Sequence, residues 1–384
     1  MKFIHTSDWQ IGKPFNRILD HEKREKLKQQ RIDAAQNLKD IILQNDIDFV
    51  LIAGDLFDSP MPSDSLISST LFVIGEFEVP VVVIPGNHDF GGPGSFWMDD
   101  NFQKEAKTMA PNLIVALEET PIVLDNKAVI FPCPLLKQNE TRNLLSWIND
   151  EVLDSFNSDL PKIVLAHGSI HGFESTGDSE HAINDLNLNS LNLNKIDFVA
   201  LGDWHGTKKI NDKTWYSGTH EIDRFPKGDN NNPGNVLIVE LLDKNVNVDV
   251  LHSSQMKWHT LSFKVYTKDD LNAMFDKINE VTALRVNQDL LHLTVDGVLG
   301  LDDLDFFQAE LKRVKARLIR VKDYINIEVK PSHEELIGLC KRNSDELTRN
   351  VAQKLVDKLS ADNSNDAEIA SLALRALYLE IKNN

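Results

Sequence analysis

The amino-acid sequence predicts an α/β protein in which a sheet buried on both faces is followed by a smaller α/β module and a helical segment. Two observations predict the first part: short, continuous apolar runs alternate with stretches whose apolar residues recur at helical spacing. The third observation is a change of pattern near Met256, after which a shorter alternation of strand and helix begins. These changes predict domains at 1–256, 257–330 and 331–384.

Five apolar runs in the first domain predict strands that end in polar side chains. The runs cover residues 3–7, 48–53, 79–84, 162–166 and 197–201. The polar residues that follow them are Asp8, Asp55, Asn87, His167, and Asp203 with His205. Apolar residues at helical spacing over 27–42 and 65–77 predict the helices between the first three strands. Because ligands in open α/β sheets bind beyond the carboxyl ends of the strands, five such ends predict one shared site.

The remaining elements complete the first domain and build the two that follow it. Strands are predicted at 214–218, 235–242 and 245–251, and near 261–265, 291–295 and 325–329. A capping box from Thr267 to Asp270 predicts the start of the first of two helices in the second domain. The third domain is helical in character, with a break at 360–366. Its apolar stripes are Leu347, Val351, Leu355 and Leu359 before the break, and Ile369, Leu372, Ala373, Ala376 and Leu379 after it.

Composition predicts a globular protein of the cytoplasm. The only two cysteines, Cys133 and Cys340, exclude a disulfide scaffold or a cysteine zinc site and suit a reducing compartment. No apolar run is long enough for a membrane helix, and the first residues carry no secretory signal pattern. Lys and Arg total 41 and Asp and Glu 59, which gives a net charge of −18. A protein that grips nucleic acid alone is usually basic, so DNA binding would need help from metal ions or a partner.

The polar strand ends predict a site for divalent metal ions. The candidate ligands are Asp8, Gln10, Asp55, Asn87, His167, Asp203 and His205. Oxygen donors with two imidazoles and no thiolate suit Mn²⁺, Mg²⁺ or Fe²⁺ better than a structural zinc. A shared carboxylate would hold two ions about 3.5–4 Å apart, where a bridging water becomes a nucleophile for phosphoryl displacement. His88 is then predicted to stabilise the leaving oxygen; the alternative is that it only holds its loop.

These residues resemble the five motifs of the calcineurin-like metallophosphoesterases, which are DxH, GDxxD, GNHD or GNHE, a lone His, and GHxH. The matching segments, in the same order, are 8–10 (DWQ), 54–58 (GDLFD), 86–89 (GNHD), His167 and 202–205 (GDWH). The segments 5–9 (HTSDW), 54–59 (GDLFDS) and 216–225 (YSGTHEIDRF) also resemble the DNA-repair nuclease branch, which contains SbcD-type and meiotic-recombination-eleven-type nucleases.

The resemblance implies a four-layer α/β/β/α sandwich, a small α/β capping domain that contacts DNA, and a C-terminal helical segment that docks a coiled-coil ATPase. It implies two Mn²⁺ ions, with Mg²⁺ possible. Asp8, Gln10 and His205 would bind metal one. Asn87, His167 and Asp203 would bind metal two, with Asp55 as the bridge. His88 would be the catalytic histidine, Asp58 would orient loop backbone, and Asp89 would orient His88.

Two positions depart from the family pattern. Gln10 stands where the family has the histidine of DxH, and Asp203 replaces the first histidine of GHxH. Both side chains can coordinate through oxygen, which makes the site more suited to Mn²⁺ or Mg²⁺. The alternative is a weak metal one and diminished catalysis.

Two groups of basic residues are candidates for DNA contact. Six of them fall within a short stretch of the second domain: Lys312, Arg313, Lys315, Arg317, Arg320 and Lys322. The alternative for such a run is a solvated face. Lys13 and Arg17 follow the Asp8 loop and are predicted to contact phosphates. The stretch 23–31, which contains Lys23, Arg24, Lys26, Lys28 and Arg31, is predicted to be mainly solvated.

The sequence therefore predicts a metal-dependent nuclease subunit that hydrolyses DNA phosphodiesters at ends, in DNA repair or recombination. Its expected partners are DNA and an SMC-like, ABC-type ATPase of the SbcC kind, with the chain forming a homodimer within a heterotetramer. One alternative is a DNA-end-binding subunit with weakened catalysis. The other is a phosphomonoesterase or cyclic-nucleotide phosphodiesterase on the same scaffold, which would have no evident need for the second and third domains.

Overall fold

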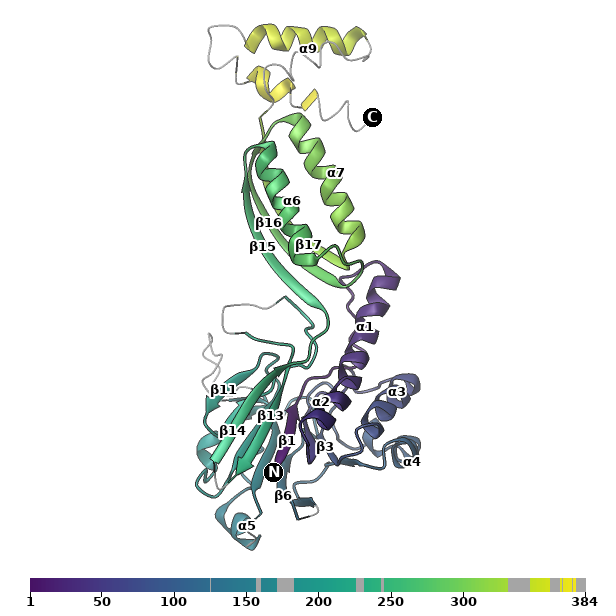
Figure 1. Cartoon of the computed structure of the whole chain (residues 1–384), viewed down its shortest axis with the longest axis vertical. Helices are drawn as coiled ribbons and strands as arrows, with labels where there is room; N and C mark the ends of the chain where they lie inside the picture. The colour runs from purple at the N-terminus through teal and green to yellow at the C-terminus, as the bar shows by residue number, and fades with distance from the viewer. Residues whose placement is uncertain are drawn as a thin grey trace. The chain divides into compact units, whose positions relative to one another are not determined.

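The computed structural model divides the chain into two compact units, Met1–Lys257 and Trp258–Asn384 (Figure 1). The residues that it describes are 1–124, 126–156, 160–170, 183–225, 231–242, 245–330, 346–359, 367, 369–374 and 376–377. The second unit contains both the second and the third domain of the sequence prediction. No helix in the described part of the chain is long and apolar enough to cross a membrane.

The first unit is built on two six-stranded sheets. The first has the order β14-β13-β1-β2-β3-β4, and its last four strands are parallel. The second has the order β11-β12-β10-β7-β6-β5, with antiparallel edge strands around a parallel centre. The first sheet comprises β1 Lys2–Thr6, β2 Phe49–Ala53, β3 Val81–Ile84, β4 Leu113–Val115, β13 Asn235–Leu242 and β14 Asn245–His252. The second comprises β5 Ile122–Leu124, β6 Ala128–Cys133, β7 Lys162–His167, β10 Phe198–Gly202, β11 Lys208–Asn211 and β12 Thr214–Tyr216.

Apolar side chains bind the two sheets face to face and attach helices outside them. Between the sheets, the Phe3 and Phe49 rings stack at 5.0 Å, and Phe198 of the opposite sheet meets Phe3 edge-on at 5.6 Å. The outer face of the first sheet is covered by α1 His21–Gln36, α2 Leu38–Gln44, α3 Asp64–Gly75 and α4 Asp100–Met109, with the 3₁₀ turn Phe96–Met98. The second sheet is covered more thinly, by α5 Asp150–Ser155, the 3₁₀ turn Leu188–Ser190 and connecting segments. The predicted four-layer α/β/β/α sandwich is confirmed.

Local signals in the sequence explain where the outer helices begin and end. The side chains of Asp20, Asp99 and Asn149 each accept a backbone N–H in the first turn of α1, α4 and α5, respectively. The single helix predicted over 27–42 is in fact two helices, because α1 ends at Gln36 and α2 begins at Leu38. Its predicted apolar face is nevertheless the buried one, apart from Ile41, which is partly buried.

The second unit begins with a three-stranded sheet covered by two helices. The sheet has the order β15-β16-β17, and β16 and β17 are parallel. Its elements are β15 Lys257–Val265, α6 Lys268–Thr282, β16 Asp289–Leu299, α7 Leu301–Arg317 and β17 Arg320–Val329. The predicted capping box is present, since Thr267 and Asp270 each accept the other's backbone N–H. These strands and helices alternate in the order expected for the small α/β module at 257–330, whose boundaries as a domain stay a prediction.

The C-terminal segment packs part of its apolar surface on this module. Helix α9, Glu346–Leu359, buries Ala352 and Val356, which cluster with Leu374 and with Leu301 at the start of α7. Leu355, Leu359 and Leu377 are partly buried against the same cluster. Of the predicted stripes, Leu347 and Val351 before the break are exposed, as are Ile369 and Leu372 after it. Leu379 lies outside the described residues.

Candidate metal centre

Polar side chains from both sheets meet beyond the carboxyl ends of their strands. Asp8 and Asp55 follow β1 and β2, and His167 is the last residue of β7; one potential ligand atom from each lies within 4.8 Å of the others. All three side chains are buried. Asn87, after β3, places its Oδ1 3.0 Å from His167 Nε2, and Asp203, after β10, places its Oδ1 3.9 Å from the same nitrogen. Five strand ends therefore converge on one cluster of acceptors.

The imidazole of His167 is oriented by backbone on one side and by carboxylates on the other. Its Nδ1 donates to the carbonyl of Ala53 at 2.8 Å, so Nε2 is the nitrogen that faces the cluster. Gly54 makes this approach possible, because a Cβ there would lie 2.3 Å from His167 Nδ1. Burial alone would lower the pKa of His167, but the carboxylates of Asp55, Asp8 and Asp203 outweigh it and raise the pKa to about 9.

This raised pKa predicts that metal binding releases a proton. At neutral pH the metal-free imidazole carries a proton on Nε2 that a cation must displace, so Mn²⁺ affinity should rise about tenfold per pH unit below pH 9. Calorimetry in buffers of different ionisation enthalpy measures the number of protons released. Binding of Mn²⁺ to His167→Gln should no longer release that proton. Asn87→Ser removes a ligand that does not titrate, so it should bind Mn²⁺ more weakly but still release the proton. If wild type and His167→Gln released the same number of protons on binding Mn²⁺, His167 would not be the source of the proton.

Backbone strain is concentrated at four of the predicted ligands. Asp8, Gln10, Asp55 and Asp203 have φ angles of +52°, +41°, +53° and +99°. Such conformations cost on the order of 1–3 kcal/mol each and persist only where surrounding contacts impose them. Here the Asp8 N–H donates to Gly54 O at 3.1 Å and the Gln10 N–H to Asp55 O at 2.8 Å. The fold therefore stabilises these turns in the arrangement that brings the side chains together.

The cluster around Asp55 and His167 fits a hard divalent cation. Asp8 Oδ2 accepts from the Ser7 hydroxyl and from the Asp203 N–H, whereas Asp8 Oδ1 is buried without a hydrogen-bond partner among the described residues. A buried carboxylate oxygen with no donor is costly, and burial raises the pKa of Asp8. A cation would satisfy that oxygen. Carboxylates, an amide oxygen and one imidazole form the donor set that Mn²⁺ and Mg²⁺ accept.

The remaining predicted ligands, Gln10 and His205, are engaged differently. Lys13 Nζ donates to Gln10 Oε1, and Gln10 Nε2 faces Asp55 Oδ2 at 3.2 Å and His205 Nε2 at 3.4 Å. His205 Nδ1 lies 3.2 Å from Asp223 Oδ2, which also pairs with Lys13 at 3.1 Å. Burial alone would raise the pKa of Asp223, but its contacts with His205 and Lys13, together with the nearby Arg31, hold it well below its usual range. This half of the site already contains side-chain cations.

His88 lies at the edge of the cluster, partly exposed. Its backbone N–H donates to Asp55 Oδ1 at 2.9 Å, and its Nδ1 donates to the carbonyl of Asp58 at 3.2 Å. Asp89 accepts the backbone N–H groups of Gly86 and Phe57. The roles expected for the two aspartates are therefore reversed: Asp89 ties two loops together, and Asp58 anchors the His88 ring. With Nδ1 anchored, His88 Nε2 is the ring atom left to meet a substrate.

The predicted DNA-contacting residues lie in different surroundings. Lys13 is part of the cluster, and Arg17 is exposed on the loop before α1. The basic group on α7 and β17 belongs to the second unit, where Arg313 pairs with Glu310, and Lys315 pairs with Asp323 at 3.0 Å. Arg317 donates to Asn279 at 2.8 Å, and Lys322 lies over the Tyr324 ring at 5.2 Å. Lys312 is exposed and Arg320 is half-buried. DNA contact by this group stays a prediction.

Sequence reasoning missed three residues that shape the cluster. Arg31, expected to be solvated, is completely buried and donates to the carbonyls of Asp8 and Trp9. The burial of Arg31 could have been predicted from its spacing, because it lies on the same helical face as Leu27 and Ala35. Asp223 and Arg224 stand in the segment 216–225 that carried the resemblance, but their partner His205 is 18 and 19 residues away, so only the fold reveals the contact.

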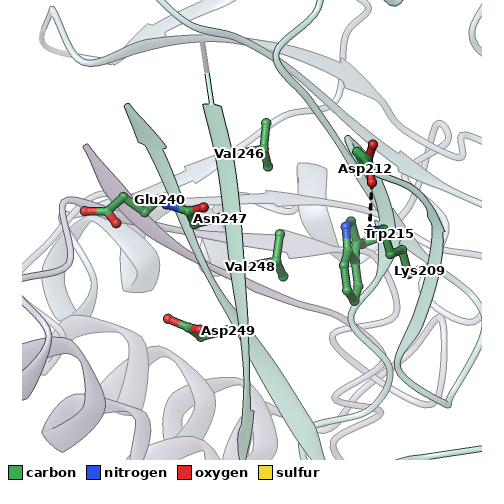
Figure 2. Close-up of a pocket in the computed structure, with 8 residues that line it drawn as sticks. All are labelled: Lys209, Asp212, Trp215, Glu240, Val246, Asn247, Val248 and Asp249. Atoms are coloured by element: carbon green, nitrogen blue, oxygen red, sulfur yellow. Dashed lines mark ion pairs between the residues drawn. The ribbon is translucent and has the colours of Figure 1, made fainter. Parts of the chain in front are cut away.

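A separate pocket of about 570 Å³ opens where β11 and β12 approach β13 and β14 (Figure 2). It is lined by Lys209, Asp212, Trp215, Glu240 and Val246–Asp249. The Lys209–Asp212 ion pair, at 2.8 Å, lies at one side of it. None of the predicted site residues lines this pocket, so it is distinct from the metal centre.

Comparison with known proteins finds similarities in sequence and in structure. The family model of the calcineurin-like phosphoesterases matches residues 1–207. The chain is 27% identical over 242 residues to the SbcD subunit of the SbcCD nuclease of Staphylococcus epidermidis, over 57% of this chain and 61% of that protein. It thus spans about three fifths of the length of this curated relative. A solved crystal structure aligns with a TM-score of 0.40 and 15% identity, over 65% of this chain and 98% of that chain, a likeness that carries no argument.

Proposed function

Because the chain belongs to the calcineurin-like phosphoesterase family, we propose that it is a metal-dependent nuclease subunit that hydrolyses phosphodiester bonds at DNA ends. The observation that carries this proposal is the convergence of Asp8, Asp55 and His167, with Asn87 and Asp203 beside them, in a buried cluster. DNA as the substrate is supported by the similarity to a curated nuclease subunit. Mn²⁺ is the proposed ion, and Mg²⁺ is the alternative that the same donors accept.

The roles of the chain's own residues follow from their contacts. Asp8, Asp55, Asn87, His167 and Asp203 would hold a divalent ion, which would supply an activated water and neutralise phosphate charge. The doubly protonated ring of His88 would give the Nε2 proton to the leaving oxygen and keep the Nδ1–H bond to the Asp58 carbonyl, which fixes the direction of Nε2. The buried Asp89 and the strained turns keep these groups at fixed positions before substrate arrives.

The test is hydrolysis of two substrates by the full chain. We expect end-labelled DNA and a chromogenic phosphodiester to be cleaved with Mn²⁺, more slowly with Mg²⁺, and not with chelator. Asp55→Asn should abolish both activities, and Lys127→Met, which breaks an ion pair with Asp48 outside the cluster, should leave them intact. Activity that survives chelator or Asp55→Asn would refute the proposal. Cleavage of phosphomonoesters in preference to both substrates would favour the phosphomonoesterase alternative.

We further propose that the exposed apolar side chains of the C-terminal segment dock an SMC-like ATPase, with the chain as a homodimer in a heterotetramer. Leu347, Ile369 and Leu372 are 74%, 60% and 61% exposed, although neighbouring residues are buried on the capping module. Exposed apolar side chains that gather in one segment are typical of protein interfaces.

Substitution of the exposed leucines tests this docking without disturbing the buried ones. The double variant Leu347→Asp, Leu372→Asp should no longer co-purify with the ATPase subunit while it keeps Mn²⁺ binding and phosphodiesterase activity. Val286→Asp is the matched control, because Val286 is equally apolar, 60% exposed and in the same unit. Co-purification of the double variant at the wild-type level would contradict the docking role. Light scattering of the purified complex measures the proposed stoichiometry.

A further inference from the structure

The two halves of the predicted two-metal site differ in charge. We infer that this chain holds one divalent ion, at the Asp55–His167 half, and that the ammonium of Lys13, assisted by Arg224, takes the place of the second ion. The inference rests on the proposed phosphodiesterase function, which it refines. The residues predicted for metal one do not fit a second ion, and four features of the structure carry that conclusion.

The first feature is the orientation of the Gln10 amide. Its Oε1, the only atom of the side chain that can bind a cation, accepts a hydrogen bond from Lys13 Nζ. Its Nε2 donates toward Asp55 Oδ2 at 3.2 Å. Turning the amide over would place the oxygen against a carboxylate and the NH₂ group against an ammonium. Both contacts would be repulsive, so Gln10 presents a donor to the centre of the cluster.

The second feature is the position of Lys13. The ammonium is 3.1 Å from Asp223 Oδ2 and 3.3 Å from Asp58 Oδ1, in addition to its bond with Gln10. Its side chain is 19% exposed, and that of Asp223 is fully buried. A lysine with three acceptors and little exposure is fixed in place. It brings a permanent positive charge to the half of the site that the family resemblance assigns to metal one.

The third feature is the environment of His205. Nδ1 donates to Asp223, which leaves Nε2 as the nitrogen with a lone pair. That nitrogen is approached by Gln10 Nε2 at 3.4 Å, and Arg224 Nη2 lies beside both ring nitrogens, 3.1 Å from Nδ1 and 3.2 Å from Nε2. Arg224 is held by Asp223 at 3.1 Å. A divalent ion on His205 would therefore lie beside a guanidinium as well as an ammonium, and like charges at such distances repel.

The fourth feature is the contrast with the other half. Around His167 Nε2 the neighbours are oxygens of Asn87, Asp55 and Asp203, at 3.0, 3.6 and 3.9 Å. Against the five carboxylates of Asp8, Asp55, Asp58, Asp203 and Asp223, one divalent ion with Lys13 and Arg224 leaves one net negative charge, and a second ion would turn it into one net positive charge. The contrast between the halves therefore rests on position: oxygens surround His167 Nε2, whereas Lys13 and Arg224 lie in the half that contains His205. The loss of the DxH histidine and the presence of Lys13 three residues later are thus parts of one arrangement.

The consequence for the reaction is that the positive charge of Lys13, held by its three acceptors, acts on the scissile phosphate through its field. A fixed ammonium near the phosphate would stabilise negative charge on its non-bridging oxygens, the contribution that a second ion would otherwise make. Lys13→Met should therefore lower the turnover of DNA at least tenfold without removing the tightly bound ion. Lys13→Arg, which keeps the charge, should recover part of that loss.

Metal counting on the full chain tests the inference independently of activity. In a Mn²⁺ titration followed by calorimetry and electron paramagnetic resonance, wild type should bind one tight ion per chain and give a mononuclear signal. The double variant Gln10→His, Lys13→Met restores the family ligand and removes the ammonium, so it should bind a second ion and give a spin-coupled signal. Lys127→Met is the control for loss of a lysine, and it should behave as wild type.

The outcomes separate this inference from the proposed function. Two tightly bound ions or a spin-coupled pair in wild type would overturn the inference, while metal-dependent cleavage of DNA would still support the function. A double variant that folds, as judged by circular dichroism, but still binds a single ion would also count against it. If the wild-type chain binds one ion but hydrolyses no phosphodiester, the proposed function is wrong while the one-ion inference still stands.

Discussion

Replacing His88 by alanine is expected to lower the turnover of DNA about 10²- to 10⁴-fold while the bound metal ion stays in place. The ring is not among the residues that surround His167, and its Nδ1 is bonded to the Asp58 carbonyl, so Nε2 is the atom that faces the substrate and donates a proton when the ring is doubly protonated. The measurement is single-turnover cleavage of end-labelled DNA, with Mn²⁺ affinity determined in parallel. His21→Ala, which removes an exposed histidine at the start of α1, is the matched control.

The leaving group gives this prediction a sharper form. A DNA 3′- or 5′-oxygen is a poor leaving group and needs a proton, whereas p-nitrophenolate leaves without one. His88→Ala should therefore cost much less with a p-nitrophenyl phosphodiester than with DNA. An equal loss on both substrates would indicate that His88 positions the metal or the loop instead, and so would a fall in Mn²⁺ affinity.

The parts of the fold that the sequence predicted are those whose signal is local. A strand buried on both faces is a continuous apolar run, so β1, β2, β3, β7 and β10 could be located within one or two residues. Strand β6, Ala128–Cys133, was not predicted, and it contains Pro132, which lacks an N–H. The proline is tolerated because β5 pairs only with Ala128–Ile130, so Pro132 lies beyond the end of that ladder.

The candidate site was predictable as a set of residues but not as a set of contacts. Strand ends and motif spacing bring Asp8, Asp55 and His167 to one place. Whether Gln10 offers its oxygen or its NH₂ depends on Lys13 and on Asp223, and the latter arrives from a segment more than 200 residues later. Charge signs along a sequence do not reveal such pairings. In the same way, the sequence shows the apolar stripe of α9, but tertiary contacts decide that Ala352 and Val356 pack on the module while Leu347 and Val351 are exposed.

Replacing Arg31 by methionine is expected to lower the free energy of unfolding of the first unit by about 3–5 kcal/mol. The guanidinium is completely buried, and it donates to the carbonyls of Trp9, Glu221 and Asp8 at 2.7, 2.9 and 2.9 Å. Methionine has similar length but no donor, so three buried carbonyls would lose their partner at about 1–3 kcal/mol each before relaxation. Urea unfolding in chelator measures the change, followed by tryptophan fluorescence, because five of the six tryptophans lie within Met1–Lys257.

The same variant links stability to metal binding. Arg31 holds the carbonyl of Asp8, whose φ of +52° is imposed by its surroundings, so a folded fraction of Arg31→Met should also bind Mn²⁺ at least tenfold more weakly. Lys26→Met on the same helix is the control; because Lys26 is exposed, its effect should stay within about 0.5 kcal/mol. If Arg31→Met cost less than about 1 kcal/mol, the guanidinium would not be what stabilises the Asp8 turn. Unchanged Mn²⁺ affinity in a destabilised variant would instead mean that the turn keeps its shape without Arg31, and that the contact serves folding alone.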